Sequence, residues 1–144
     1  MILLDANILI YAYASDSPFH PETKAWLEET MNRGEPIGLS WDTILAFLRI
    51  VTNPSATAAG LSGHEALAII DSIISRSHVT VITPTASHWE RLRGLLADLQ
   101  ITRNLVMDAH LAALALEHQA LLCTNDRDFL RFKGLRLTNP VQSQ

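Results

Sequence analysis

The chain begins with the stretch Met1-Ile2-Leu3-Leu4-Asp5, in which four apolar residues end at a carboxylate. A short run that is apolar at every position indicates a strand buried on both faces of a sheet. Parallel sheets covered by helices bury their strands in this way. We therefore expect residues 1–4 to form a central strand, with Asp5 at its carboxyl end.

Beyond this run, helix-like and strand-like segments alternate. Apolar residues at helical spacing predict helices near residues 8–12, 22–33, 41–52, 63–76, 89–99 and 106–119. Short β-branched or apolar runs predict strands at residues 37–39, 79–82, 121–124 and 135–137. This order predicts an α/β fold: a single three-layer α/β/α domain over residues 1–144 with a short, mostly parallel central sheet.

Composition limits the class of protein. With 144 residues, 48% of them apolar, the chain fits one globular domain, and six Gly and six Pro are too few for a low-complexity sequence. The net charge of −4 argues against a nucleic-acid binder that works by phosphate neutralisation alone. The single cysteine, Cys123, lies in an apolar run, which favours a buried thiol. No targeting segment and no apolar run of about 18 residues is visible, so we expect a soluble cytoplasmic protein.

Carboxylates follow two of the expected strands. Asp5 follows the first strand, Asp126 and Asp128 follow the strand at residues 121–124, and Asp108 stands near the start of the preceding helix. The carboxyl ends of parallel strands share one edge of a sheet, so these side chains can converge. Converging carboxylates raise one another's pKa unless a cation lies between them, and oxygen ligands suit Mg²⁺ or Mn²⁺. Helix capping and turn formation use the same residue types, so spacing alone leaves both interpretations open.

Four strings of residues carry a resemblance to a known family. They are Asp5-Ala6-Asn7, the segment 40–54 from Ser-Trp to Phe-Leu-Arg-Ile-Val-Thr-Asn-Pro, the segment 107–115 (MDAHLAALA) and the segment 124–129 (TNDRDF). In this order, and over nearly the whole chain, they resemble the PIN-domain family, most closely the VapC-type toxins of bacterial toxin–antitoxin pairs. The resemblance implies a metal-dependent ribonuclease whose acids cluster at the carboxyl edge of a parallel sheet.

The resemblance also implies the residues of the site. It makes Asp5, Asp108 and Asp126 the ligands of Mg²⁺, for which Mn²⁺ can substitute, and Asp128 an auxiliary catalytic acid. The family expects one more acid, a Glu immediately before Phe47, and this chain has Ala46 there. We therefore expect a weakened or inactivated enzyme.

Ala46 has three interpretations. It is an engineered replacement that disarms a toxic nuclease, which we favour, or a natural divergence that weakens the enzyme. In the third, Asp42 supplies the carboxylate from one turn earlier, although a rise of about 5.4 Å would misplace a ligand.

The resemblance implies an RNA substrate, a small antitoxin that covers the acidic pocket, and a homodimer formed through helices, with no membrane contact. Two alternatives remain open: an inactive antitoxin-binding module, and a haloacid-dehalogenase-like Mg²⁺ phosphatase. The phosphatase needs a second Asp two residues after the first, where this chain has Asn7.

Several polar residues near the acids have more than one interpretation. Thr124 and Asn7 can hold the acids by hydrogen bonds or serve as ordinary turn residues. His110 and His118 lie on similar faces of one helix, but a hard-cation site does not need imidazole. Basic residues that can contact RNA phosphates, or can simply be solvated, follow the last acids: Arg127, Arg131, Lys133 and Arg136.

Overall fold

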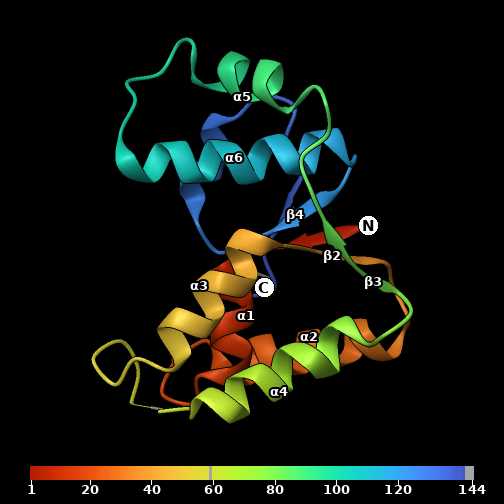
Figure 1. Cartoon of the computed structure of the whole chain (residues 1–144), viewed down its shortest axis with the longest axis vertical. Helices are drawn as coiled ribbons and strands as arrows, with labels where there is room; N and C mark the ends of the chain where they lie inside the picture. The colour runs from red at the N-terminus through yellow and green to blue at the C-terminus, as the bar shows by residue number, and fades with distance from the viewer. Residues whose placement is uncertain (59, 142–144) are drawn as a thin grey trace.

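The computed structural model, which describes residues 1–58 and 60–141, is built on a five-stranded sheet (Figure 1). Its strands are β1 (Ile2–Leu4), β2 (Ile37–Ser40), β3 (Val79–Ile82), β4 (Leu121–Cys123) and β5 (Leu137–Thr138). They lie in the order β3-β2-β1-β4-β5, and each neighbouring pair is parallel. The predicted α/β class and the central place of the first strand are confirmed.

Helices cover both faces of this sheet. They are α1 (Ala6–Tyr13), α2 (His20–Asn32), α3 (Trp41–Val51), α4 (Gly63–Ile74), α5 (His88–Leu96) and α6 (Arg103–Glu117), with a short 3₁₀ helix η1 (Arg127–Arg131). Helices α5 and α6 lie on one side of the sheet, and α1 to α4 lie on the other (Figure 1). The three layers expected from the sequence are therefore present.

Alternate side chains of each central strand enter two separate hydrophobic cores. Leu4 and Cys123 pack with the helices α1 to α4, whereas Leu3 and Leu122 pack with α6. Successive residues of a strand point to opposite faces, so a strand between two helical layers must be apolar at every position. Burial raises the pKa of the Cys123 thiol to about 12, as does the charge of Asp5, which agrees with the expected inert cysteine.

Helix caps place polar groups at the carboxyl edge of the sheet. The Asp5 carboxylate accepts a hydrogen bond from Ala6 N and caps α1, and Ser40 Oγ accepts one from Thr43 N and caps α3. Thr43 Oγ1 donates to Leu4 O over 3.0 Å, so the first turn of α3 is tied to the end of β1. Two neighbouring strands thus lead directly into helices at one edge.

Helix α6 starts earlier than its apolar pattern predicts. Thr102 is the cap and Arg103 the first helical residue, whereas we expected the helix to start at Val106. Asp108 therefore lies in the second turn, and the interpretation of Asp108 as a helix-capping residue is wrong. Residues 103 and 104 are polar and only residue 105 is apolar, so the apolar periodicity did not extend the predicted helix to this segment.

None of the helices in the described part of the chain combines the length and the apolar character that a bilayer crossing requires.

Candidate metal centre

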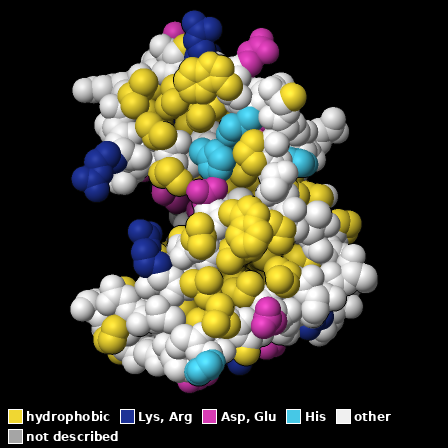
Figure 2. Space-filling view, viewed as in Figure 1, with side chains coloured by type: hydrophobic (Ala, Val, Ile, Leu, Met, Phe, Trp, Pro, Cys, Tyr) yellow, Lys and Arg dark blue, Asp and Glu magenta, His cyan; other side chains and the backbone are white. Residues whose placement is uncertain are grey.

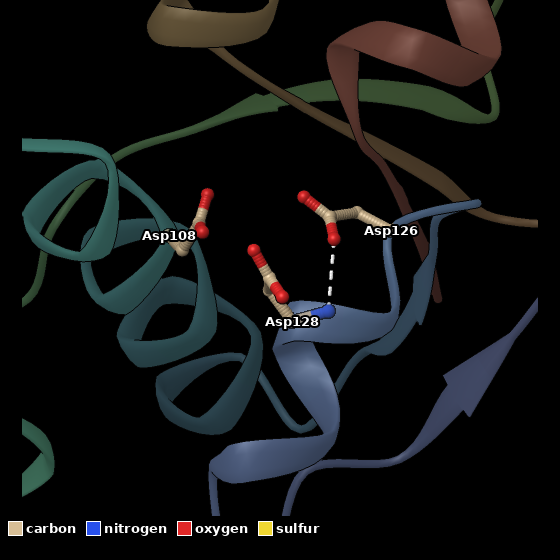
Figure 3. Close-up of side chains that lie close together, drawn as sticks. All are labelled: Asp108, Asp126 and Asp128. Atoms are coloured by element: carbon tan, nitrogen blue, oxygen red, sulfur yellow. Dashed lines mark hydrogen bonds between the residues drawn. The ribbon is translucent and has the colours of Figure 1, made fainter.

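Three carboxylates converge beside the carboxyl end of β4. One oxygen from each of Asp108, Asp126 and Asp128 lies within 4.8 Å of the other two (Figure 3). Asp108 projects from the second turn of α6, Asp126 is the N-cap of η1, and Asp128 lies in the first turn of η1. The structure thus brings together three of the predicted site residues from two segments of the chain.

The turn after β4 holds two of these carboxylates in a defined arrangement. Asp126 N donates to Thr124 Oγ1 over 3.0 Å, and Asp128 N donates to Asp126 Oδ1 over 2.8 Å. Arg131 Nη2 lies 3.2 Å from Asp128 Oδ1 and its Nε donates to Asp128 O. Asp126 therefore caps η1 with one oxygen, and its side chain also faces the other two acids (Figure 3).

Asp5 lies outside the group defined by the 4.8 Å distance. Its Oδ2 accepts hydrogen bonds from Thr124 Oγ1 at 2.7 Å and Asn7 Nδ2 at 3.1 Å, and its Oδ1 accepts from Ala6 N at 2.7 Å. Both oxygens of Asp5 are thus held by protein donors. Thr124 and Asn7 are hydrogen-bond partners of the acid, one of the two roles considered for them.

The acids destabilise one another's ionised forms. Burial, together with the charges of Asp126, Asp5 and Asp128, raises the pKa of Asp108 to about 6, although Arg131 opposes the shift. Burial also raises the pKa of Asp5, with a smaller contribution from Asp126, against the hydrogen bonds of Thr124 and Ala6. A group of carboxylates with too little positive charge around it fits a hard divalent cation, which takes oxygen ligands.

The family model for the PIN domain matches residues 2–135. The chain belongs to the PIN-domain family. Among its relatives, Ribonuclease VapC43 of Mycobacterium tuberculosis is 34% identical over 144 residues, covering 100% of this chain and 98% of the relative. Ribonuclease VapC37 of the same species is 34% identical over 140 residues, covering 97% of each.

Solved structures share the PIN fold at lower sequence identity. VapBC-1 from nontypeable Haemophilus influenzae superposes with a TM-score of 0.69 at 19% identity, over 99% of this chain and 100% of that chain. VapBC2 from Rickettsia felis, bound to a promoter DNA fragment, gives 0.65 at 23% identity, over 96% and 98%. These likenesses support the fold.

In this PIN domain, position 46 brings no carboxylate to the site. Ala46 lies half-buried in α3, beside the buried Phe47. Asp42, one turn earlier, pairs with His110 instead: its Oδ2 lies 2.7 Å from His110 Nε2. Asp42 therefore stands outside the three-carboxylate group, contrary to the third interpretation of Ala46.

A second polar cluster in the PIN domain was missed by sequence reasoning. His110 Nδ1 lies 2.9 Å from His88 Nε2, and His88 Nδ1 lies 2.6 Å from Glu117 Oε2. Burial raises the pKa of Glu117, but hydrogen bonds from Thr85 and His88 outweigh it and hold the pKa below its usual value. Together with Asp42 these side chains link α3, α6 and α5, whereas His118 contacts Thr83 O and not His110.

One sequence signal does point to this cluster. His110 and Glu117 are seven residues apart and so share a face of α6. Their partners come from α3 and α5, whose placement against α6 is a property of the folded chain.

Proposed function

We propose that this chain is a metal-dependent endoribonuclease, the toxin of a toxin–antitoxin pair, that hydrolyses RNA phosphodiesters. The convergence of Asp108, Asp126 and Asp128 within 4.8 Å carries the proposal. Full-length relatives at 34% identity bear the name ribonuclease, which supports it.

We propose Asp5, Asp108 and Asp126 as the residues that would hold Mg²⁺, or Mn²⁺ in its place. The grouping of Asp128 with Asp108 and Asp126 supports it as a further ligand, whereas Asp5 would have to exchange one of its hydrogen bonds for the cation. A divalent cation there lowers the pKa of a water molecule and offsets the charge that the phosphate gains in the transition state. The chain's own residues orient the acids for this task. Thr124 Oγ1 links the residue that follows β1 to the residues that follow β4, because it donates to Asp5 and accepts from Asp126 N.

Ala46 weakens this proposed activity, because α3 supplies no acid to the centre. We expect Ala46→Glu to increase Mg²⁺- or Mn²⁺-dependent cleavage of RNA by at least about tenfold, in line with the loss that follows removal of one group that orients or holds a metal. Single-turnover cleavage of a labelled RNA, with and without EDTA, measures this change.

Two matched variants control this experiment. Ala68→Glu makes the same substitution at an exposed position of α4, outside the acidic group and the proposed dimer contact, and leaves the rate unchanged. Ala46→Glu combined with Asp126→Asn abolishes the gain. Absence of RNA cleavage by the Ala46→Glu chain in both Mg²⁺ and Mn²⁺ contradicts the proposal.

The alternative is an antitoxin-binding module without catalysis. VapBC complexes are among the solved structures that share the fold, which favours a small antitoxin as the partner in either case. Copurification of a stoichiometric small protein, together with no cleavage by the Ala46→Glu chain, favours the module. The phosphatase alternative loses its acid/base group, since the Asn7 amide bonds with Asp5, Thr124 and Asn125 N.

We also propose a homodimer through α3 and α5. Trp41 and Leu45 on α3 are 55% and 60% exposed, and Trp89 on α5 is 70% exposed. Figure 2 shows hydrophobic side chains gathered over both helices on one face of the molecule. An exposed apolar surface of this kind is typical of a protein–protein contact.

A further inference from the structure

A cleft of about 390 Å³ opens beside the acidic centre, on the side of β4 that faces β5. Asp126 and Thr124 line it, so the cleft and the centre share a wall. Its volume is within the range of pockets that bind small ligands. We propose that this cleft binds the nucleotide next to the cleaved phosphodiester and so selects the RNA sequence that is cut. The proposal rests on the proposed ribonuclease function.

The wall that the cleft shares with the acidic centre places the cleft next to the bond that would be cleaved. A phosphate held by a cation at the centre would lie close to Asp126, whose carboxylate faces Asp108 and Asp128 (Figure 3). A nucleotide attached to that phosphate can enter the cleft, which adjoins the centre on the β5 side.

The walls of the cleft combine apolar and hydrogen-bonding groups. Leu130, which is 72% exposed, and Leu137 supply apolar surface. Asn125, Thr138 and Asn139 supply polar side chains. A nucleobase in single-stranded RNA offers apolar faces and a polar edge, and proteins that recognise it contact both. This combination favours a base over a purely anionic or purely apolar ligand.

Asn125 is the residue best placed to read the base edge. Asn139 Nδ2 donates to Asn125 Oδ1 over 2.8 Å, which sets the orientation of the Asn125 amide. Its NH₂ group makes no hydrogen bond to any other residue within 1–58 and 60–141, so it is available to donate. The ligand is therefore a base with an acceptor oxygen or nitrogen on its exposed edge.

Arg127 supplies a cation for the ribose-phosphate backbone. It is exposed and lines the cleft, and no carboxylate in the described ranges lies within ion-pair distance of its guanidinium. The nearby Arg131, in contrast, is paired with Asp128. An unpaired Arg beside an acidic centre suits a phosphate, to which it can donate two parallel hydrogen bonds.

Binding is tested on the unmodified chain with the four nucleoside 5′-monophosphates as probes, in Mg²⁺. Two-dimensional NMR should show shifts of the Asn125 and Asn139 side-chain amides, and at least one nucleotide should bind about fivefold more tightly than another. Asn125→Leu and Arg127→Gln each weaken that binding about fivefold or more. The matched controls are Asn32→Leu, at the last residue of α2, and Arg33→Gln, at its C-cap, and they leave binding unchanged.

A surface variant keeps this test valid if Asn125→Leu does not fold. Leu130→Glu changes an exposed side chain and places a negative charge at the mouth of the cleft, so it weakens nucleotide binding in a folded protein. Absence of shifts at the two amides, or binding of an acidic peptide but of no nucleotide, overturns the inference.

Sequence selection is tested separately in the Ala46→Glu chain, with a pool of RNA randomised around the cleaved position and sequencing of the product ends. Asn125→Leu in that background should lower the preference at one position next to the cleaved bond about tenfold, the size of one lost base contact. An unchanged preference at every position overturns the inference and leaves the ribonuclease function standing. Failure of the Ala46→Glu chain to cleave removes the function, while the nucleotide titration still tests the cleft.

Discussion

Asp108 links the stability of the protein to pH. Its folded pKa of about 6 lies above the ordinary value of 3.8, so the folded state binds more protons than the unfolded state between these values. Its contribution to stability is therefore fully present below about pH 4 and is lost as pH rises through 6. In the absence of metal, this carboxyl destabilises the fold at neutral pH.

Asp108→Asn should consequently stabilise the metal-free protein at pH 8 by about 1 kcal/mol, a figure reduced for solvent screening of a half-buried group. Near pH 4 the variant and the parent should have equal stability. Urea unfolding in EDTA at both pH values measures the difference. A gain that persists at pH 4 indicates another cause, such as altered packing.

Thr124 stabilises the site through its hydroxyl. It is buried, donates to Asp5 Oδ2 over 2.7 Å and accepts from Asp126 N over 3.0 Å. Thr124→Val keeps the shape of the side chain and removes these bonds together with the one that Thr124 Oγ1 accepts from Asn7 Nδ2, so it should cost about 1–3 kcal/mol of unfolding free energy and weaken Mn²⁺ binding. Thr124→Ser keeps the hydroxyl and is the matched control. Urea unfolding and calorimetric Mn²⁺ titration report the two effects, and equal behaviour of the Val and Ser variants contradicts this role.

The sequence predicts which acids can converge at the sheet edge but not how they group there. Asp126 and Asp108 are predicted because a strand end and a helix near it share one edge of a parallel sheet. That Asp128 joins them within 4.8 Å, while Asp5 is held by Thr124 and Asn7, depends on hydrogen bonds within the turn at residues 124–128. Residue types and spacing do not specify those bonds.

At the scale of the elements, a chain of hydrogen-bonded side chains links three helices, α3, α6 and α5. Its members are Asp42, His110, His88 and Glu117. The Glu117 side chain is 1% exposed, and His88 and Thr85 are its hydrogen-bond partners. A buried carboxylate that loses a partner pays the cost of its desolvation.

His88→Ala should therefore destabilise the protein by about 2–3 kcal/mol, the range for a broken bond to a buried charge. His64→Ala, at an exposed position of α4, is the control and should have little effect. Urea unfolding at pH 7 compares the two. A loss below about 0.5 kcal/mol for His88→Ala, the level of an ordinary surface substitution, shows that the cluster does not stabilise the contact between helices.

The elements themselves were predictable where local signals were strong. Ser62 caps α4 by accepting from Glu65 N, and a Ser followed three residues later by a Glu is a known signal for the start of a helix. The apolar run at residues 1–4 forms β1. Helix α5 ends at Leu96, although the pattern continues to Leu99, and η1 was not expected. Short 3₁₀ segments have no apolar period of their own, which explains the second omission.

At the scale of the whole molecule, the exposed apolar face predicts the oligomeric state. Trp41→Arg places a charge in the proposed contact between copies and should convert a dimer to a monomer in light scattering. Because Trp41 is largely exposed, the variant and the parent should have the same unfolding midpoint at a protein concentration where both are monomeric. A parent chain that is monomeric at all concentrations contradicts the proposed dimer.

The strand order shows what the sequence leaves undetermined about the whole fold. Alternation of helices and strands predicts a parallel sheet, and the uninterrupted apolar run at residues 1–4 predicts that β1 is central. The order β3-β2-β1-β4-β5 depends on which way each crossover turns, a choice made by packing of all the helices together. The pairing of β1 with β4 is nevertheless what brings Asp5 next to Thr124.

The pairing of β1 with β4 has a consequence for synthesis on the ribosome. β1 pairs with β4, and Asp5 bonds to Thr124, 119 residues later in the chain. Translation delivers Asp5 first, Asp108 later, and Asp126 and Asp128 last of the four. A growing chain thus lacks two of the three grouped carboxylates until residue 128 has been made, and the proposed nuclease centre cannot assemble before then.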